Sequence, residues 1–292
     1  MILINYKIAD IVFQFSTEYS LKIKEELSLF YTDDKNVDFR YNIEARNLHH
    51  NNGFKKIFSN LKKEVYKNNN NYILYYTELK KKGFYLSVLK NSSKNREIYI
   101  KNEFVNICKN LSYLIEHIDI HSDLLRKDAL ILHSSYIIHE GNAILFTAPS
   151  GVGKSTQANL WEKYMGAEII NGDRSIIKEK NGVMYAYGLP FSGSSQICKN
   201  KNAPIKAIIL LEQGNENKIY DLKSSYILKF LLSQIAVNRW DKSELLKVME
   251  LIENIIEKIP IVKLSCLPDK GAVEIVDNYL SKLEGGEIEW VI

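Results

Sequence analysis

The chain has 292 residues, of which 46% are hydrophobic and 25% are charged, and it carries a formal net charge of +4. These values are typical of a globular protein and allow a sizeable core in one large domain or two of ordinary size. The mild, scattered positive charge argues against a nucleic-acid binder, and no apolar run approaches the ~20 residues that span a bilayer.

The cysteines and the N-terminus predict a cytoplasmic protein. Cys108, Cys198 and Cys266 lie far apart and lack the paired spacing of a zinc site or a disulfide framework. A reducing compartment is the simplest inference from them. The N-terminal segment has neither a charged leader nor a small-residue cleavage site, so we expect no signal peptide.

Residues 1–100 predict a small β-rich domain with a soft boundary near residue 100. β-forming residues predict strands at 8–15, 71–77, 83–90 and 96–101, with a turn at 91–95. The apolar spacing over residues 55–66 predicts a helix instead. His49 and His50 lie beside Asn and Gly, which favours a solvated loop over a metal site. No chemical motif occurs in this region, and its position alone suggests substrate recognition.

Residues 101–292 begin with a predicted helix over 104–118, in which Cys108 is a core residue. Strands are then expected at 129–138 and 143–147, joined by a two-residue turn at Glu140-Gly141. In such a hairpin the numbers of two residues that face each other across the strands sum to 281, so His133 falls opposite Ala148. His133 then lies at the start of the loop that follows. The alternative is a half-buried strand histidine without a ligand, because a one-residue slip would reverse its facing.

The loop at residues 148–156 (APSGVGKST) lies between a buried strand and a helix, which is the order of a P-loop. Gly151 and Gly153 let the backbone turn close to phosphate, and the helix N-terminus adds positive potential. Lys154 reaches the terminal phosphates, and the Ser155 hydroxyl is placed to bind Mg²⁺. The residues expected to contact the nucleotide are Ser150, Gly151, Val152, Gly153, Lys154, Ser155 and Thr156.

A short apolar strand at residues 168–171 ends near Asp173. A carboxylate at the end of a neighbouring strand can hold Mg²⁺ directly or through water, and the alternative is an ordinary turn aspartate. Arg174 would contact phosphate or face solvent. Beyond it we expect strands at 183–187, 205–211 and 259–264, and helices at 226–237, 245–258 and 272–283.

The ordered motifs resemble the HPr kinase-related P-loop kinases. The matching segments are LHSS at 132–135, APSGVGKST at 148–156, NGDRS at 171–175, YGLPFSG at 187–193 and APIKAIILLEQ at 203–213. The resemblance covers residues 128–213 and does not extend to the first 100. It implies a mixed α/β fold with a phosphoenolpyruvate-carboxykinase-like P-loop domain over 101–292, beside the smaller β-rich domain.

The resemblance also implies a role for each site residue. His133 would lie near the transferred phosphate, while Lys154 and Ser155 keep the roles given above. The family often has two adjacent acids where this chain has Gly172 and Asp173, and its acid before the 188–195 loop is missing here. Asp173 would therefore bind metal and also act on the acceptor, or His133 would be the base.

We therefore expect a kinase that uses ATP (or another NTP) and Mg²⁺ to phosphorylate a hydroxyl, most simply a serine of a peptide or small protein. A free amino acid as acceptor, or a non-catalytic nucleotide-sensing module, are the alternatives. We expect no nucleic-acid or membrane partner, and the sequence leaves a homo-oligomer open.

Overall fold

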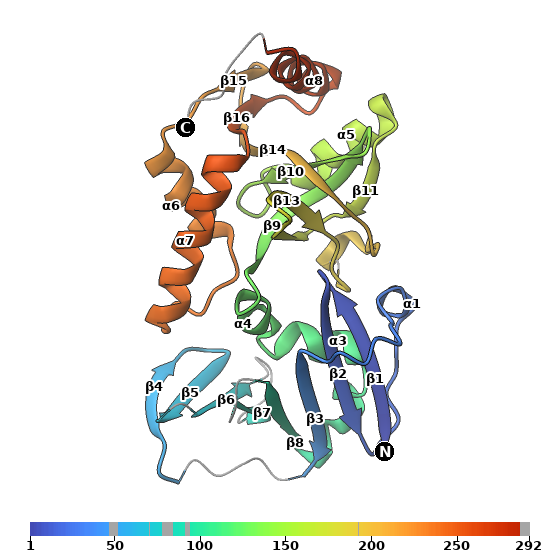
Figure 1. Cartoon of the computed structure of the whole chain (residues 1–292), viewed down its shortest axis with the longest axis vertical. Helices are drawn as coiled ribbons and strands as arrows, with labels where there is room; N and C mark the ends of the chain where they lie inside the picture. Colours follow the sequence, from blue (N-terminus) through green and yellow to red (C-terminus); the bar gives the residue numbers. More distant parts are fainter. Residues whose placement is uncertain (47–51, 70, 78–83, 91–93, 192, 287–292) are drawn as a thin grey trace. The chain divides into compact units, whose positions relative to one another are not determined.

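The computed structural model describes residues 1–46, 52–69, 71–77, 84–90, 94–191 and 193–286 (Figure 1). The chain forms two compact units, Met1–Asp123 and Leu124–Ile292. The short helical segments between residues 102 and 123 therefore belong to the first unit, whereas the sequence analysis put a boundary near residue 100. Both units combine strands with helices, so the mixed α/β class is confirmed.

Unit 1 is built on one eight-stranded sheet with the order β1-β2-β3-β8-β7-β6-β5-β4. Its strands are β1 (Ile2–Ile8), β2 (Ile11–Thr17), β3 (Phe39–Ala45), β4 (Lys55–Ser59), β5 (Lys63–Asn68), β6 (Asn71–Thr77), β7 (Phe84–Lys90) and β8 (Asn95–Ile100). Its helices are α1 (Glu25–Ser28), η1 (Asn102–Phe104), α2 (Val105–Cys108), α3 (Leu111–His117) and α4 (Ile120–Leu125), whose last two residues belong to unit 2.

The predicted strand over 8–15 is confirmed at residues 8 and 11–15, but a hairpin turn at 9–10 divides it between β1 and β2. Ala9 and Asp10 both have positive φ, 51° and 63°, and Ile8 pairs with Ile11. Two central residues with positive φ form the type I′ turn that suits the right-handed twist of paired strands. The predicted strands at 71–77, 83–90 and 96–101 correspond to β6, β7 and β8. Residues 47–51, 83 and 91–93, including His49 and His50, lie outside the described part.

The predicted helix over 55–66 is also wrong, since the segment forms the β4–β5 hairpin. Val65 is fully buried, but Ile57 and Leu61 are 42% and 85% exposed, so the apolar stripe has no common buried face. β5 pairs along its length with β6, which supplies the backbone hydrogen bonds that a local helix would have formed. Tertiary pairing thus overrides a weak local pattern.

The predicted helix over 104–118 exists as three short pieces, η1, α2 and α3. The break falls at Asn110, whose side chain accepts a hydrogen bond from the Tyr113 backbone N–H and caps α3. An N-cap asparagine satisfies one of the free donors of a helix start. Cys108 is fully buried, which confirms it as a core residue.

A buried ion pair joins the unit 1 sheet to α4. The Arg96 guanidinium on β8 donates to both carboxylate oxygens of Asp123, with Nε at 3.1 Å from Oδ2, and the Tyr41 hydroxyl donates to the same carboxylate. Arg96 and Asp123 are only 1% and 0% exposed. Since neither charge can return to water, each depends on the other.

We expect Asp123→Asn to lower the free energy of unfolding of unit 1 by about 3–5 kcal/mol, because it removes the carboxylate charge that lies against the buried Arg96 guanidinium. Urea unfolding followed by circular dichroism measures the change. Glu44→Gln is the control, since Glu44 forms an exposed pair with Arg46 at 3.1 Å and should cost less than about 1 kcal/mol. Equal effects of the two substitutions would contradict this account.

Unit 2 contains eight strands and four longer helices among its described residues. The strands are β9 (Ala129–His139), β10 (Asn142–Thr147), β11 (Glu168–Asn171), β12 (Arg174–Lys180), β13 (Val183–Tyr187), β14 (Asn202–Gln213), β15 (Lys218–Tyr220) and β16 (Ile261–Cys266). The helices are α5 (Lys154–Met165), α6 (Ser224–Gln234), α7 (Lys242–Lys258) and α8 (Lys270–Glu284), with the short η2 (Gly193–Ser195).

Two long strands, β9 and β14, each pair with three neighbouring strands along their length. The first half of β9 pairs with β12 and its second half with β10 and β11. The first residues of β14 pair with β13, and the rest with β10 and β16. The pairings β9–β10–β14–β13–β12–β9 therefore close a ring of five strands.

The helices of unit 2 cover two separate apolar clusters. One cluster lies between the strands and α6 and α7, which run side by side in Figure 1. The other packs α5 and α8 against the strands, with the fully buried Trp161 of α5 in it. β10 lies between β9 and β14, so the loop that follows β10 starts between these two neighbours. No helix in the described ranges combines the length and apolar character needed to cross a membrane.

Candidate functional site

The β9–β10 hairpin has the predicted register. His139 pairs with Asn142 and Ser134 with Thr147, so each pair of residue numbers sums to 281. The turn residues Glu140 and Gly141 have positive φ of 47° and 79°. The Thr147 hydroxyl donates to the His133 carbonyl oxygen at 2.9 Å, which fixes His133 beside the end of β10.

The loop after β10 has the backbone of a phosphate cradle. Gly151 and Gly153 have φ of +83° and +124°, and α5 begins at Lys154. A Cβ at either glycine would meet no atom within 4 Å, so the backbone conformation and not a lack of space requires glycine there. The open space, the turned backbone and the start of a 12-residue helix together fit an anion.

Lys154 is held inside this loop. Its Nζ donates to the carbonyl oxygens of Ala148 at 2.9 Å and Pro149 at 3.2 Å, and the residue is only 7% exposed. Burial lowers the pKa of the Lys154 ammonium, and the negative charge of Asp173 acts in the opposite direction. Within the described part of the chain its hydrogen-bond partners are neutral carbonyl oxygens, so this buried cation would gain strongly from an incoming phosphate.

Asn171 organises the turn that carries Asp173, and the sequence analysis gave it no role. It is fully buried, and its Oδ1 accepts from the backbone N–H groups of Asp173 at 2.9 Å and Arg174 at 3.0 Å. Its Nδ2 donates to the Phe191 carbonyl oxygen at 3.0 Å. The signal was present as Asn-Gly-Asp, since asparagine readily bonds the backbone two residues on.

Asp173 lies between two cationic or potentially cationic side chains. Its Oδ1 is 3.5 Å from Nε2 of His133, and its Oδ2 is 3.2 Å from Nε of Arg174. The hydrogen bond from His133 is the main cause that lowers the pKa of the Asp173 carboxyl, helped by Arg174, while burial opposes it. Arg174 also lies 5.3 Å from the centre of the Phe191 ring. The Arg174 side chain is 34% exposed and is held by Asp173, and its predicted contact with phosphate stays a prediction.

The P-loop helix and the Asp173 turn are joined at Gly172. The Ser155 hydroxyl donates to the Gly172 carbonyl oxygen at 3.3 Å, and the Ser135 hydroxyl donates to the same oxygen at 3.0 Å. The structure thus brings the predicted residues of the loop, His133, Asp173 and Arg174 into one neighbourhood.

The glycine at 172 has a steric reason. A Cβ there would lie 2.5 Å from Cβ of Ser195, so the space for a second acid is filled by η2. Gly193, with φ of +55°, passes so close to Asp173 that its own Cβ would lie 2.7 Å from the carboxyl carbon. Gly193 of the 188–195 loop therefore packs on Asp173.

The donor set fits Mg²⁺ carried by a nucleotide. Within the described ranges, no group of three or more His, Cys, Asp or Glu residues could hold a metal ion. Mg²⁺ usually keeps several waters and binds through one or two carboxylates and the substrate phosphates. The Ser155 hydroxyl and the Asp173 carboxylate supply the protein part of such a set.

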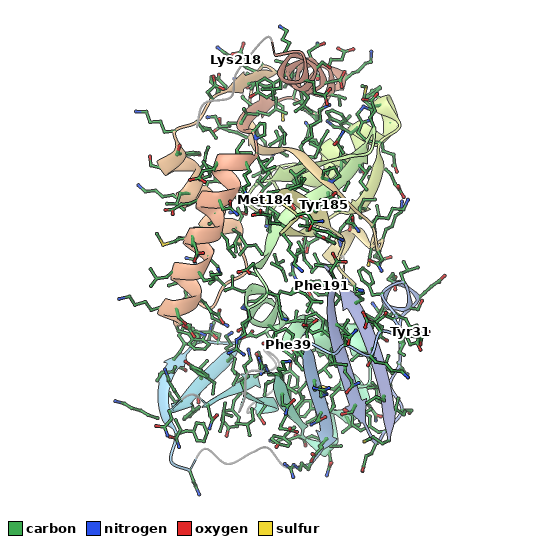
Figure 2. The ribbon with its side chains drawn as sticks, in the orientation of Figure 1. Tyr31, Phe39, Met184, Tyr185, Phe191 and Lys218 are labelled. Carbon is green, nitrogen blue, oxygen red and sulfur yellow. The ribbon has the colours of Figure 1, made fainter. Side chains whose placement is uncertain are left out.

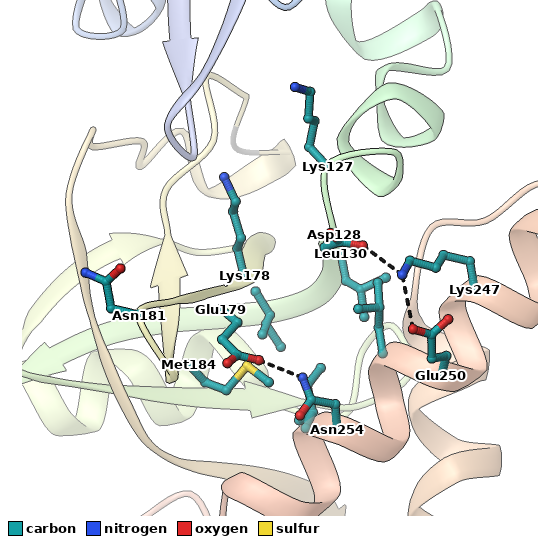
Figure 3. Close-up of a pocket in the computed structure, with 13 residues that line it drawn as sticks. Lys127, Asp128, Leu130, Lys178, Glu179, Asn181, Met184, Lys247, Glu250 and Asn254 are labelled. Carbon is teal, nitrogen blue, oxygen red and sulfur yellow. Dashed lines mark hydrogen bonds and ion pairs between the residues drawn. The ribbon is translucent and has the colours of Figure 1, made fainter. Parts of the chain in front are cut away.

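Away from these residues, unit 2 has a pocket of about 420 Å³ between the β12–β13 hairpin and α7 (Figure 3). Lys247 is bound there to Asp128 at 2.8 Å and to Glu250 at 3.2 Å. Glu179 accepts from Asn254 at 2.8 Å. None of the predicted site residues lines this pocket, and these charges are compensated within the protein.

Comparisons with known proteins add little to this geometry. No protein-family model and no curated protein matches the chain. Among solved structures it is similar to the structure of the Hpr(Ser) kinase/phosphatase from Coxiella burnetii, at 12% identity and a TM-score of 0.30. That similarity covers 54% of this chain and 94% of the other. A TM-score of this size assigns neither a fold family nor a function to this chain.

We expect His133→Ala to raise the pKa of Asp173 towards its ordinary value near 3.8, because the largest cause of the lowering is lost. Carboxyl ¹³C NMR titration measures this pKa.

The lowered pKa of Asp173 also makes the stability of the fold depend on pH. A carboxyl whose pKa is lower in the folded state than in the unfolded state stabilises the fold above the unfolded pKa, and this contribution disappears as the pH falls through the folded pKa. Asp173→Asn should thus destabilise the fold at pH 7, by an amount that shrinks as the pH falls below 3.8 and through the lowered folded-state pKa.

His139→Ala is the matched control for the NMR titration of Asp173 in the His133→Ala protein. His139 lies on the same strand, but its ring packs on Trp161 at 5.4 Å between centroids and not on Asp173. The Asp173 pKa should not respond to it. A His133→Ala protein with an unchanged Asp173 pKa would show that the two side chains do not interact.

Proposed function

We propose that this protein binds a nucleoside triphosphate, most simply ATP, at residues 148–156 and transfers its terminal phosphoryl group to a hydroxyl. The observation that carries the proposal is the junction at Gly172, where the P-loop serine meets the turn of Asp173. A phosphate cradle alone supports binding, whereas a carboxylate and a histidine beside it support chemistry. The motif order supports a serine of a peptide or small protein as acceptor.

The cationic groups of the site stabilise charge. The N–H groups of residues 150–156 surround the phosphates, and Lys154 exchanges its bonds to Ala148 and Pro149 for bonds to phosphate oxygens. Arg174 is placed beside the same region by its pairing with Asp173. Phosphoryl transfer depends mainly on such positioning and charge neutralisation.

Ser155 and Asp173 would hold Mg²⁺, which when bound neutralises charge on the two terminal phosphates. Asp173 would thus bind the metal as well as contact the acceptor, whereas an ordinary general base only accepts a proton. Because its pKa is lowered, Asp173 is ionised at neutral pH and is a weak base.

In the transfer itself, the acceptor oxygen forms a bond to the terminal phosphorus as the bond from phosphorus to the bridging oxygen breaks. The nucleoside diphosphate leaves. Asp173 accepts a hydrogen bond from the acceptor hydroxyl and orients it, and the proton passes through this carboxylate to solvent. His133 holds Asp173 in place. Unit 1 would recognise the acceptor, and a cytoplasmic location supplies the nucleotide.

One observation favours a second function, a nucleotide-sensing module without transfer. Asp173 is already compensated by His133 and Arg174, and Ser195 fills the space of a second acid beside it. A site with one compensated carboxylate binds nucleotide well but is poor at activating an acceptor. The two functions differ in whether label leaves ATP.

The test uses ATP labelled in its terminal phosphate and a set of serine-containing peptides. We expect label on peptide, and Asp173→Asn should reduce the rate of transfer by about 10²–10⁴-fold, because an oriented carboxylate is lost.

Lys154→Ala should abolish nucleotide binding, measured by calorimetry. Lys163→Ala is the control, since Lys163 lies exposed on the same helix with its ammonium 4.9 Å from the centre of the Tyr164 ring.

Two results separate the alternatives. Label that stays on ATP, together with Lys154-dependent binding, would replace the kinase by the sensing module. Label on free serine but on no peptide would keep the kinase and replace its acceptor by a free amino acid.

A further inference from the structure

The P-loop adjoins a pocket on the side away from Asp173. The pocket has a volume of about 410 Å³ and is lined by the P-loop, the end of β14, α6 and one residue of β16. Its lining residues include Pro149, Ser150, Gly151, Val152, Gln213, Tyr226, Phe230 and Lys263. β10 pairs with β9 on one side and with β14 on the other. His133 and Asp173 thus flank the loop on the β9 side, and the pocket flanks it on the β14 side.

Two aromatic rings form one wall of the pocket. Tyr226 and Phe230 lie one turn apart on α6, with ring centroids 6.2 Å apart and 27° between their planes. Tyr226 is 47% exposed, while Phe230 is partly buried against the core beneath α6. An accessible aromatic face supported by a second ring is suited to stacking with a planar heterocycle.

The polar side of the pocket is fixed to the loop. The Gln213 amide donates to the carbonyl oxygens of Gly151 at 3.5 Å and Val152 at 3.4 Å, which ties the end of β14 to the cradle. Lys263 of β16 pairs with Glu212 at 3.0 Å and lies 5.0 Å from the Tyr220 ring. Gln213, Lys263 and Glu212 thus offer hydrogen-bond donors and acceptors to a polar ring edge or a sugar. The Lys263–Glu212 pair adds no net charge to the pocket.

We propose that this pocket holds the nucleoside of the triphosphate, with the base stacked on Tyr226 and Phe230. The inference rests on the proposed function, because it requires the loop to bind the phosphates. The nucleotide then crosses the loop from the pocket towards Asp173, with its terminal phosphate at the acceptor side. Recognition of the base comes from stacking, and the small charge-balanced rim favours a neutral heterocycle.

The test compares ATP with inorganic tripolyphosphate, both with Mg²⁺, by calorimetry. The wild-type chain should bind ATP roughly ten- to a hundredfold more tightly, the range expected for one stacked base. Tyr226→Ala should remove most of that difference and leave tripolyphosphate affinity unchanged. Phe230→Leu, which keeps apolar volume beneath α6 but removes the ring, should act in the same direction.

Two comparisons make the result decisive. Tyr164→Ala is the control, since Tyr164 is an exposed aromatic of α5 outside the pocket, and it should change neither affinity. Lys154→Ala should weaken both ligands. If ATP binding depends on Lys154 but not on Tyr226 or Phe230, the pocket proposal is overturned and the proposed function stands. If wild-type protein binds neither ligand, both are wrong.

Discussion

The pairing of β9 with three neighbouring strands determines the geometry of the site. Its pairing with β10 places His133 beside the start of the P-loop, and its pairing with β12 sets Arg174 opposite His133. The backbone N–H of Ser134 also donates to the Asp173 carbonyl oxygen at 3.1 Å. Because side chains alternate between the faces of a strand, a slip of one residue would turn His133 away from Asp173. The loop, the acid and the histidine would then no longer share one neighbourhood.

The charge balance around this strand explains how one carboxylate can serve a polyphosphate site. Asp173 is compensated by His133 and Arg174, while the Lys154 ammonium donates to the carbonyl oxygens of Ala148 and Pro149 in its own loop. The region therefore favours a ligand that is itself strongly anionic. Figure 2 labels Phe191, whose ring lies 5.3 Å from the Arg174 guanidinium. In the aromatic pocket beyond the loop, Lys263 is paired with Glu212, so the pocket suits the neutral end of the same ligand.

The features that sequence predicted are those fixed by short-range geometry. The turn at Glu140-Gly141 allowed the β9–β10 register to be calculated, because a two-residue turn determines every pair that follows. The β4–β5 hairpin was mistaken for a helix, since only pairing with β6 decides it. Gly172 was interpreted as a missing acid, although Ser195, 23 positions later, fills that space. Such contacts join distant parts of the chain and leave no periodic signal in the sequence.

The central claim is that the backbone of residues 150–156 binds the phosphates of a nucleotide. Amide NMR of ¹⁵N-labelled protein during titration with Mg²⁺ and ATP tests it most directly, because amide shifts respond to a new hydrogen bond at each N–H group. We predict the largest changes at Gly151, Gly153 and the first turn of α5. Amides of this loop that stay unchanged while ATP saturates the protein, or that shift less than those of unit 1, would contradict the account.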